Sequence, residues 1–231
     1  MAYTPTVWKN GEFPPIDAEH LNKIEQGIAN SAPGGFGLGW GAKALTSSDD
    51  VNDIAASGWY SWYERSVPKN AINLSWVTIM RVDGHLGGVF VQTAYGVTDA
   101  INYYTQPIVA RRMRYSSAIG EWEYENPPME LGIEYRTTER YLGKPVYCKL
   151  VDCGTVPAVG ASKTIVVDPN AIIFSVSAYS PQRGLGIPFL DANGVKLEIN
   201  QSGNTLVFRN YSETQSDTNA HAVVKYTKIT D

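Results

Sequence analysis

Apolar and polar residues alternate along much of this chain, which is the pattern of strands with one buried and one solvated face. In the C-terminal part, Val195, Leu197 and Ile199 are separated by single polar residues. Short runs of turn residues interrupt the apolar segments, and Asn193-Gly194 and Ser202-Gly203-Asn204 have the chemistry that β-hairpins require. The pattern therefore predicts a mainly β fold.

A convincing helical pattern occurs only near the N-terminus. Asp17 can cap the free N–H groups of a first turn, and Ile16 and Leu21 have the spacing of a hydrophobic staple. Leu21, Ile24 and Ile28 form a narrow apolar stripe that suits a seam between identical helices. We expect this short helix to seed an oligomer. Packing of the helix on its own domain explains the spacing equally well, because an isolated helix of this length must bury its stripe somewhere.

Two sets of apolar and aromatic runs predict two β domains, with Pro127-Pro128 as a natural boundary between them. The first set covers residues 58–63, 76–82, 88–95, 108–115 and 121–124, with Asp83-Gly84-His85 as the turn of a hairpin. The second set covers residues 163–167, 171–178, 186–190, 195–199, 205–211 and 220–229. We expect the second set to form an antiparallel sandwich of jelly-roll type.

The chain is thus expected to have four segments. They are an N-terminal arm and helix for attachment and oligomerisation at 1–30, a Gly-rich linker at 31–45, a small β domain at 46–127 and a C-terminal β-sandwich at 128–231. Five glycines lie among residues 31–41, which favours a hinge or a close approach of chains. A phosphate-binding loop is the alternative, but no Lys-Ser/Thr ending follows and the run comes after a helix.

The amino-acid composition limits the classes of function that we expect for this protein. Only 18% of residues are charged, while 14 Tyr and 6 Trp suit a β-rich adhesive surface. The net charge of −4 argues against a general nucleic-acid binder, because phosphate neutralisation needs excess cations. No run approaches the roughly 18 apolar residues of a membrane span, and no signal region opens the chain. We expect a soluble protein that does not insert into membranes.

The two cysteines, Cys148 and Cys153, lie five residues apart in one predicted strand. An extended strand places them on opposite faces and about 16 Å apart, whereas a disulfide needs Cα atoms within about 7 Å. They should not pair with each other, which indicates synthesis in a reducing compartment. No second Cys or His pair stands nearby to complete a metal site.

The N-terminal arm and helix resemble a known protein family. Trp8-Lys9-Asn10-Gly11, followed by the helical stretch 16–28, is similar to the opening of tail-fibre and receptor-binding proteins of bacteriophages and prophages. This resemblance implies a homotrimer with Leu21, Ile24 and Ile28 in the interface. It also implies that the arm binds other tail or baseplate proteins, in a virion tail made in the bacterial host cytoplasm.

Two further stretches carry a similar resemblance. The order Asn52-Asp53-Ile54, Gly58-Trp59-Tyr60, a middle hairpin, Gln92, Arg111 or Arg112, and Trp122 resembles the knob domain of pyocin and phage tail fibres. The stretch 137–147 looks like the start of a C-terminal head domain of phage tail proteins. These families imply decoration and attachment and carry no catalytic motif to transfer.

Enzymatic chemistry is the weaker interpretation. A polysaccharide hydrolase needs paired carboxylates, and the local acidic series is Glu121, Glu123 and Glu125. We expect these to form cross-strand pairs with Arg112 and Arg114 on a solvated face. The sequence predicts no catalytic residues, no cofactor and no metal.

A calcium loop is the alternative for residues 191–194. Asp191-Ala192-Asn193-Gly194 begins like such a loop, with Glu198 downstream, but the spacing does not reach the twelve-residue loop with its terminal Glu. A hairpin turn explains all four residues and is favoured.

Glycan adhesion needs aromatic faces beside planar polar side chains, because the former stack on sugar rings and the latter bond hydroxyls. The candidate receptor-binding residues lie on three segments: Tyr179, Gln182 and Arg183; Arg209 and Tyr211; Tyr103 and Tyr104. The alternative is that Tyr179 and Tyr211 fill the sandwich core and Arg183 is merely solvated. The sequence thus favours a trimeric adhesin for a host cell-surface glycan over a polysaccharide-cleaving tail enzyme or a structural tail connector.

Overall fold

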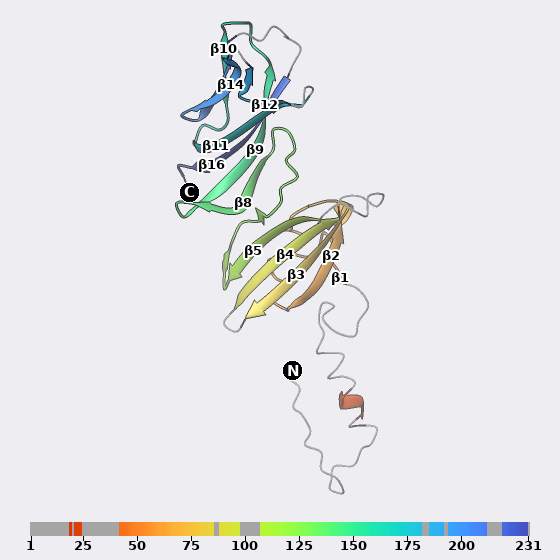
Figure 1. Ribbon diagram of the computed structural model, residues 1–231. Coiled ribbons are helices and arrows are strands. Elements are labelled where there is room, and N and C mark those ends of the chain that lie inside the picture. The colour runs from red at the N-terminus through yellow and green to blue at the C-terminus, as the bar shows by residue number, and fades with distance from the viewer. Residues whose placement is uncertain are drawn as a thin grey trace. The chain divides into compact units, whose positions relative to one another are not determined.

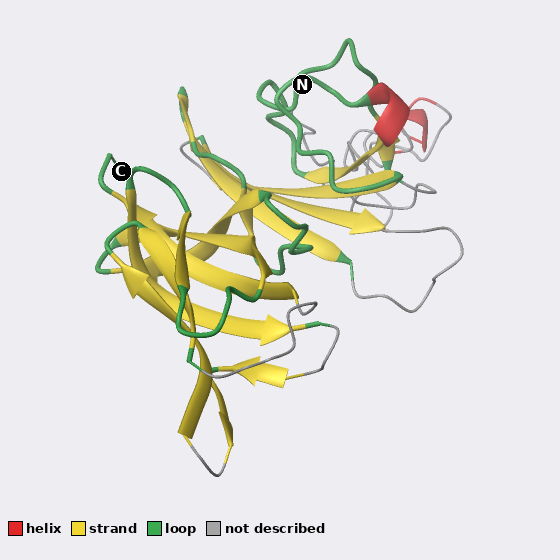
Figure 2. Cartoon of the chain, turned by 90° about the horizontal axis from the view of Figure 1, so that it is seen from above, coloured by secondary structure: helices red, strands yellow, loops and turns green. Residues whose placement is uncertain are grey.

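The structure is a computed structural model that describes residues 19, 21–24, 42–85, 88–97, 107–181, 185–191, 194–211 and 219–230. Strands dominate these residues, and the described helical residues are 19 and 21–24 (Figure 1, Figure 2). The predicted mainly β fold is confirmed. Within the described ranges, no helix has the length and apolar character needed to cross a membrane. The chain divides into two compact units, Met1–Pro107 with Arg112–Glu121, and Ile108–Arg111 with Trp122–Asp231.

The first unit is a twisted antiparallel sheet with one parallel edge. In order across the sheet it contains β1 (Lys43–Ala44), β2 (Gly58–Tyr63), β3 (Val77–His85), β4 (Val89–Val97) and the Arg112–Tyr115 part of β5 (Ile108–Tyr115), with β6 (Ala118–Ile119) paired to β5. β1, which lies within the predicted linker 31–45, runs parallel to β2. β3 is antiparallel to both of its neighbours, β2 and β4. A 3₁₀ turn, η2 (Glu64–Ser66), follows β2.

Alternation along the strands explains which face of this sheet is buried. Tyr60 and Trp62 of β2 and Met80 and Val82 of β3 point to the same side and are almost fully buried. Loop residues close that side, including Val51, which is completely buried. The period-2 pattern thus becomes a core on one face of the sheet.

The predicted turn at Asp83-Gly84-His85 is wrong, although the hairpin itself is confirmed. These residues continue β3 and pair with Val91, Phe90 and Val89 of β4, so the reversal falls between His85 and Gly88. The glycine serves a close approach instead of a turn. A Cβ at Gly84 would lie 2.8 Å from the Phe90 ring, and its N–H donates to Ser57 Oγ at 2.9 Å. Glycine inside a strand often marks such a contact.

The second unit contains two sheets (Figure 1). The first has the order Ile108–Arg111 of β5, β7 (Glu123–Tyr124), β8 (Glu134–Tyr141), β9 (Lys144–Thr155), β16 (Asn219–Lys228), β11 (Ala171–Ser180) and β12 (Leu185–Ile187). The second has the order β10 (Ser162–Val166), β15 (Thr205–Asn210), β14 (Gly194–Ser202) and β13 (Phe189–Asp191). The single strand predicted at 186–190 is wrong: it is divided at Pro188, which has no N–H for a ladder, and its halves join different sheets.

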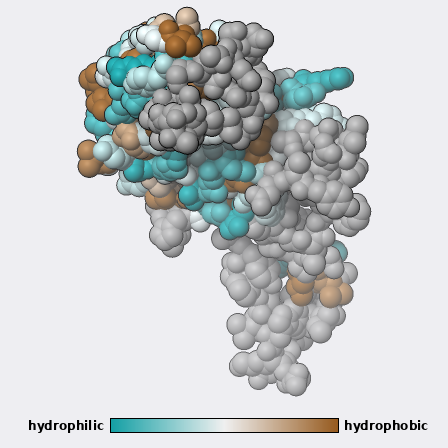
Figure 3. Space-filling view, turned by 45° about the horizontal axis from the view of Figure 1, so that its top comes forward, coloured by the Kyte–Doolittle hydropathy of each residue, from teal (hydrophilic) through white to brown (hydrophobic). Residues whose placement is uncertain are grey.

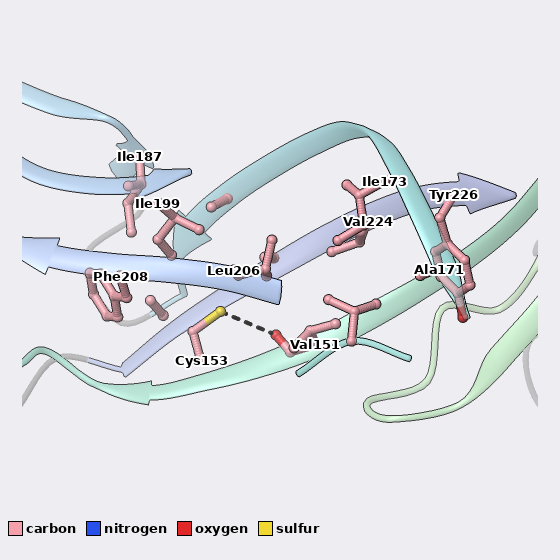
Figure 4. Close-up of a cluster of buried hydrophobic side chains, with 14 of the residues drawn as sticks. Val151, Cys153, Ala171, Ile173, Ile187, Ile199, Leu206, Phe208, Val224 and Tyr226 are labelled. Carbon is pink, nitrogen blue, oxygen red and sulfur yellow. Dashed lines mark hydrogen bonds between the residues drawn. The ribbon is translucent and has the colours of Figure 1, made fainter. Parts of the chain in front are cut away.

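One apolar core joins the two sheets of this unit (Figure 4). Leu206 and Phe208 of β15 and Val224 and Tyr226 of β16 are all fully buried and belong to one cluster. Because residues of both sheets belong to one cluster, the pair forms a sandwich-like unit.

Both cysteines are free and buried. Cys153 belongs to the core cluster, whereas Cys148 Sγ lies 3.6 Å from Met129 Sδ. The expected absence of a bond between them agrees with this placement. Burial raises the pKa of Cys153 to about 11, so its thiol stays protonated at neutral pH.

Candidate ligand-binding site

The outer face of the second sheet of unit 2 carries polar side chains. Along β15, Leu206 and Phe208 turn into the core, while Thr205, Val207 and Arg209 point away from it. Along β14, Ile199 turns inward and its neighbours outward. This face brings residues of β14 and β15 into direct opposition.

Arg209, Tyr211 and Glu198 meet on this face, and we name them the Glu198 cluster. Glu198 lies directly opposite Arg209 in the β14–β15 pair. Arg209 Nη1 is 3.9 Å from Glu198 Oε2, and the Tyr211 hydroxyl donates to the same oxygen at 2.7 Å. The arginine side chain is 51% exposed and Tyr211 is 48% exposed, so both can reach a ligand.

The carboxylate of this cluster is ionised at neutral pH. The pKa of Glu198 is lowered, chiefly by the hydrogen bond from Tyr211, and further by a hydrogen bond with Asn200 and the charge of Arg209. The cluster therefore presents a fixed acceptor, a planar donor and an aromatic ring together. This combination suits a polyhydroxylated ligand.

Glu198 belongs to this cluster but is not among the binding residues predicted from the sequence, although a signal for its position exists. The tight turn at Gly203-Asn204 pairs Ser202 with Thr205. Four residues farther from the turn along each strand, Glu198 lies opposite Arg209. The register of a hairpin with a short loop is fixed by its turn.

Other predicted binding residues are placed differently. Tyr179 of β11 is 37% exposed and packs edge-on against His221, with ring centroids 6.0 Å apart. Neither Tyr179 nor Tyr211 fills the core. The remaining candidates, Gln182, Arg183, Tyr103 and Tyr104, lie outside the described residues.

The predicted interface residues are only partly described. Leu21 is 51% exposed and Ile24 is half-buried, while Ile28 lies outside the described residues. The trimer interface therefore stays a prediction.

The first unit has an exposed aromatic pair that sequence reasoning did not single out. Tyr63 and Trp76 are both about half exposed, and their ring centroids are 6.0 Å apart at an interplanar angle of 64°. The two rings meet because Tyr63 ends β2 and Trp76 immediately precedes its partner strand β3.

On the face seen in Figure 3, apolar residues lie interspersed with hydrophilic ones over the described surface.

The predicted partners of the acidic series are wrong. Glu123 accepts from Arg136 Nε at 3.0 Å and from Arg140 Nη2 at 2.8 Å, and Arg111 Nε lies 3.1 Å from Glu125. The prediction failed because neighbouring residues of a strand point to opposite faces of the sheet. Arg111 lies on the face of the acidic residues, so its neighbour Arg112 points to the other face.

Arg112 points into the first unit, away from the acidic series. Its Nε donates to Gln92 Oε1 at 2.8 Å and its Nη2 to Asn52 Oδ1 at 2.7 Å, while Gln92 Nε2 donates to the Val51 carbonyl at 2.8 Å. Arg114 donates to the Asn52 carbonyl and, at 3.2 Å, to the Ser116 carbonyl. Burial lowers the pKa of Arg112 to about 10, so it remains charged. Three residues of the knob-like signature thus form one buried hydrogen-bonded network.

The turn at residues 191–194 agrees with a hairpin, because Asp191 pairs with Gly194 between β13 and β14. Residues 192 and 193 lie outside the described ranges. Among the described residues, no three His, Cys, Asp or Glu side chains group as metal ligands.

Comparison with known proteins gives similarity to solved structures alone. No protein-family model matches the sequence, and no curated protein matches it. An N-truncated R2-type pyocin tail fibre is similar over 80% of this chain and 96% of its own, at 12% identity and a TM-score of 0.27. The R1 pyocin fibre of P. aeruginosa matches over 79% of this chain and 66% of its own, at 13% identity and a TM-score of 0.29. The R2 pyocin fibre of P. aeruginosa matches over 83% and 69%, at 11% identity and a TM-score of 0.28. The expected similarity to pyocin tail fibres is therefore found, at low identity and low TM-score.

Proposed function

We propose that this protein is a homotrimeric, non-enzymatic receptor-binding protein of a phage-type tail, and that it attaches to a host cell-surface glycan. The observation that carries the proposal is the exposed Glu198 cluster, with its ionised carboxylate, guanidinium and phenol ring on one sheet face. The resemblance of the N-terminal arm and helix to tail-fibre openings supports the same role. In the virion, the arm binds neighbouring tail or baseplate proteins.

The chemistry of the cluster favours binding over hydrolysis. Glycoside hydrolases use two carboxyl groups about 5–9.5 Å apart, one of which must donate a proton. The cluster supplies one carboxylate, and its lowered pKa keeps it ionised where a general acid must be protonated. An ionised carboxylate instead accepts hydrogen bonds from sugar hydroxyls.

Trimerisation makes weak sites sufficient. Three copies of an exposed site on one fibre convert the second and third contacts into intramolecular events, so the apparent affinity rises without any new contact. The stripe of Leu21, Ile24 and Ile28 is the segment that we assign to the trimer interface.

An array of bacterial surface polysaccharides, probed with the intact protein, tests the function. We expect binding to a subset of glycans, and a loss of about tenfold in apparent affinity for Tyr211→Phe or Arg209→Met, because each removes a hydrogen-bonding group from the cluster. Tyr115→Phe and Arg81→Met are matched controls, since both are exposed and lie in the other unit.

Two outcomes would replace this function. A fall in the viscosity of a bound polysaccharide would identify a tail hydrolase. Absence of any glycan signal, together with a tight complex with a neighbouring tail protein, would identify a structural connector.

A further inference from the structure

The first unit contains a hollow of about 500 Å³ whose lining shares no residue with the Glu198 cluster. Its apolar lining includes Leu45, Ile54 and the ring of Tyr60. Leu45 and Tyr60 are buried, and the Tyr60 hydroxyl donates to the Ala56 carbonyl at 2.8 Å. The volume falls within the range of about 300–1,000 Å³ that is usual for ligand sites.

The rim of this hollow is held in place by hydrogen bonds. Asp49 Oδ2 accepts from Thr46 N at 2.7 Å and from Thr46 Oγ1 at 2.9 Å. Both oxygens of Asp50 accept from Asn70 Nδ2, at 3.0 and 2.8 Å, and Oδ1 also accepts from Asn52 N at 2.8 Å. A rim fixed in this way loses little freedom when a ligand binds.

The same hydrogen bonds keep two rim carboxylates ionised. The pKa of Asp49 is lowered, first by the backbone hydrogen bond of Thr46, and the charge of Lys43 adds to this. The pKa of Asp50 is lowered, first by Asn70, and the charge of Lys69 adds to this. Each lysine therefore lies near one of the aspartates.

A ligand rich in hydroxyl groups fits this lining better than a strongly charged ligand does. The lining carries three carboxylates, those of Asp49, Asp50 and Asp53, and two ammonium groups, those of Lys43 and Lys69. A sugar hydroxyl both donates and accepts, so it can use both kinds of group. Two cations against three anions leave a surplus of one negative charge, which disfavours an anionic ligand. No three acidic residues of the described chain group as metal ligands, so a metal ion is not the natural occupant.

We propose that the hollow between β1, β2 and the loop 48–56 is a glycan subsite for a neutral hexose. Asp53 and Asp49 accept from ring hydroxyls, Lys43 and Lys69 donate to hydroxyl oxygens, and Ile54 and Leu45 contact the C–H face of the ring. The inference deepens the proposed function, on which it rests, and adds a subsite in the first unit.

Saturation-transfer NMR and calorimetry on the full chain test this subsite. The probes are the methyl glycosides of glucose, galactose and mannose, with glucuronate and galacturonate as anionic counterparts. We expect at least one neutral hexoside to bind saturably, and its uronate to bind about tenfold more weakly. Asp53→Asn should weaken binding of the neutral hexoside by about tenfold, because it replaces one of the two acceptor oxygens with a donor. Glu64→Gln, an exposed acidic position outside the lining, is the matched control.

A second variant separates loss of the site from loss of the fold. Ala55→Trp places a large ring in the hollow from an exposed position, so it should abolish hexoside binding and leave the melting temperature unchanged. Binding that survives Ala55→Trp, a uronate that binds more tightly than its hexoside, or no saturable hexoside at all would overturn the subsite.

The polysaccharide array distinguishes this failure from failure of the function. If no hexoside binds the hollow while the wild-type protein and Ala55→Trp bind the array equally, the subsite is wrong and the function stands. If neither binds the array while a hexoside still saturates the hollow in a manner blocked by Ala55→Trp, the subsite stands and the proposed receptor role fails.

Discussion

At the scale of single residues, the contacts of the Glu198 cluster should change the titration of the Glu198 carboxyl, which can be measured. The folded pKa of Glu198 is depressed, mainly by the Tyr211 hydroxyl. A depressed carboxyl pKa adds stability that is present above the unfolded value, about 4.3, and is lost as the pH falls through the folded value.

Tyr211→Phe should therefore raise the pKa of Glu198 toward its ordinary value, because the largest of the groups that lower it is gone. It should also shrink the fall in melting temperature between about pH 7 and about pH 3. Carbon-detected NMR titration of the Glu198 carboxyl measures the first effect, with Tyr115→Phe as control. An unchanged titration would mean that Tyr211 does not hold the carboxylate in solution.

The buried arginine network makes a second prediction at this scale. Arg112→Met leaves Gln92 Oε1 and Asn52 Oδ1 without the hydrogen bonds that they accept, so we expect about 1–3 kcal/mol less stability. Arg112→Lys should not restore it, since an ammonium group cannot reproduce the fork of two donors. Arg81→Met, at an exposed ion pair, is the control, and chemical denaturation measures all three. Equal stability of Arg112→Met and Arg81→Met would contradict the role of the network.

At the scale of elements, the sequence predicted strands well and their neighbours poorly. The runs 58–63 and 108–115 coincide with β2 and β5, because period-2 alternation and turn residues are local signals. The partners of Glu123 and the division at Pro188 depend on which strands become neighbours, and that is decided by burial across the whole sheet. The hollow beside β1 is formed largely by a loop. A loop has no regular spacing of apolar residues, so the sequence pattern does not predict the hollow.

Gly96 of β4 gives a prediction for strand packing. A Cβ at this position would collide with Leu74 Cβ and lie 3.2 Å from the Leu74 backbone carbonyl, so the loop before β3 would have to move. We expect Gly96→Ala to cost about 1–3 kcal/mol, as overpacking does. Gly186→Ala is the matched control, because nothing lies within 4 Å of its Cβ position. Thermal unfolding compares the two, and equal melting temperatures would contradict the close approach.

At the scale of the whole molecule, assembly and folding should be separable. Leu21 and Ile24 belong to no described strand, so replacing Leu21, Ile24 and Ile28 with serine should abolish the trimer and leave both β units folded. Light scattering on a size-exclusion column should give about three times 25.4 kDa for the wild type and 25.4 kDa for the variant. Circular dichroism checks that the strands persist. A monomeric wild type would remove the avidity argument and make the helix a docking segment.

The position of β16 has a consequence for how the protein is made. This strand follows every other described strand in the chain, yet it lies between β9 and β11 in the middle of its sheet. Its inward residues Ala220, Ala222, Val224 and Tyr226 are completely buried, and Lys228 pairs with Glu134, 94 residues earlier. On the ribosome, the second unit must therefore wait for β16 before its sheet can close, while the first unit is already free to fold. A prematurely terminated chain would keep a folded first unit and expose an open, unpaired sheet, which would make it a substrate for cellular proteases.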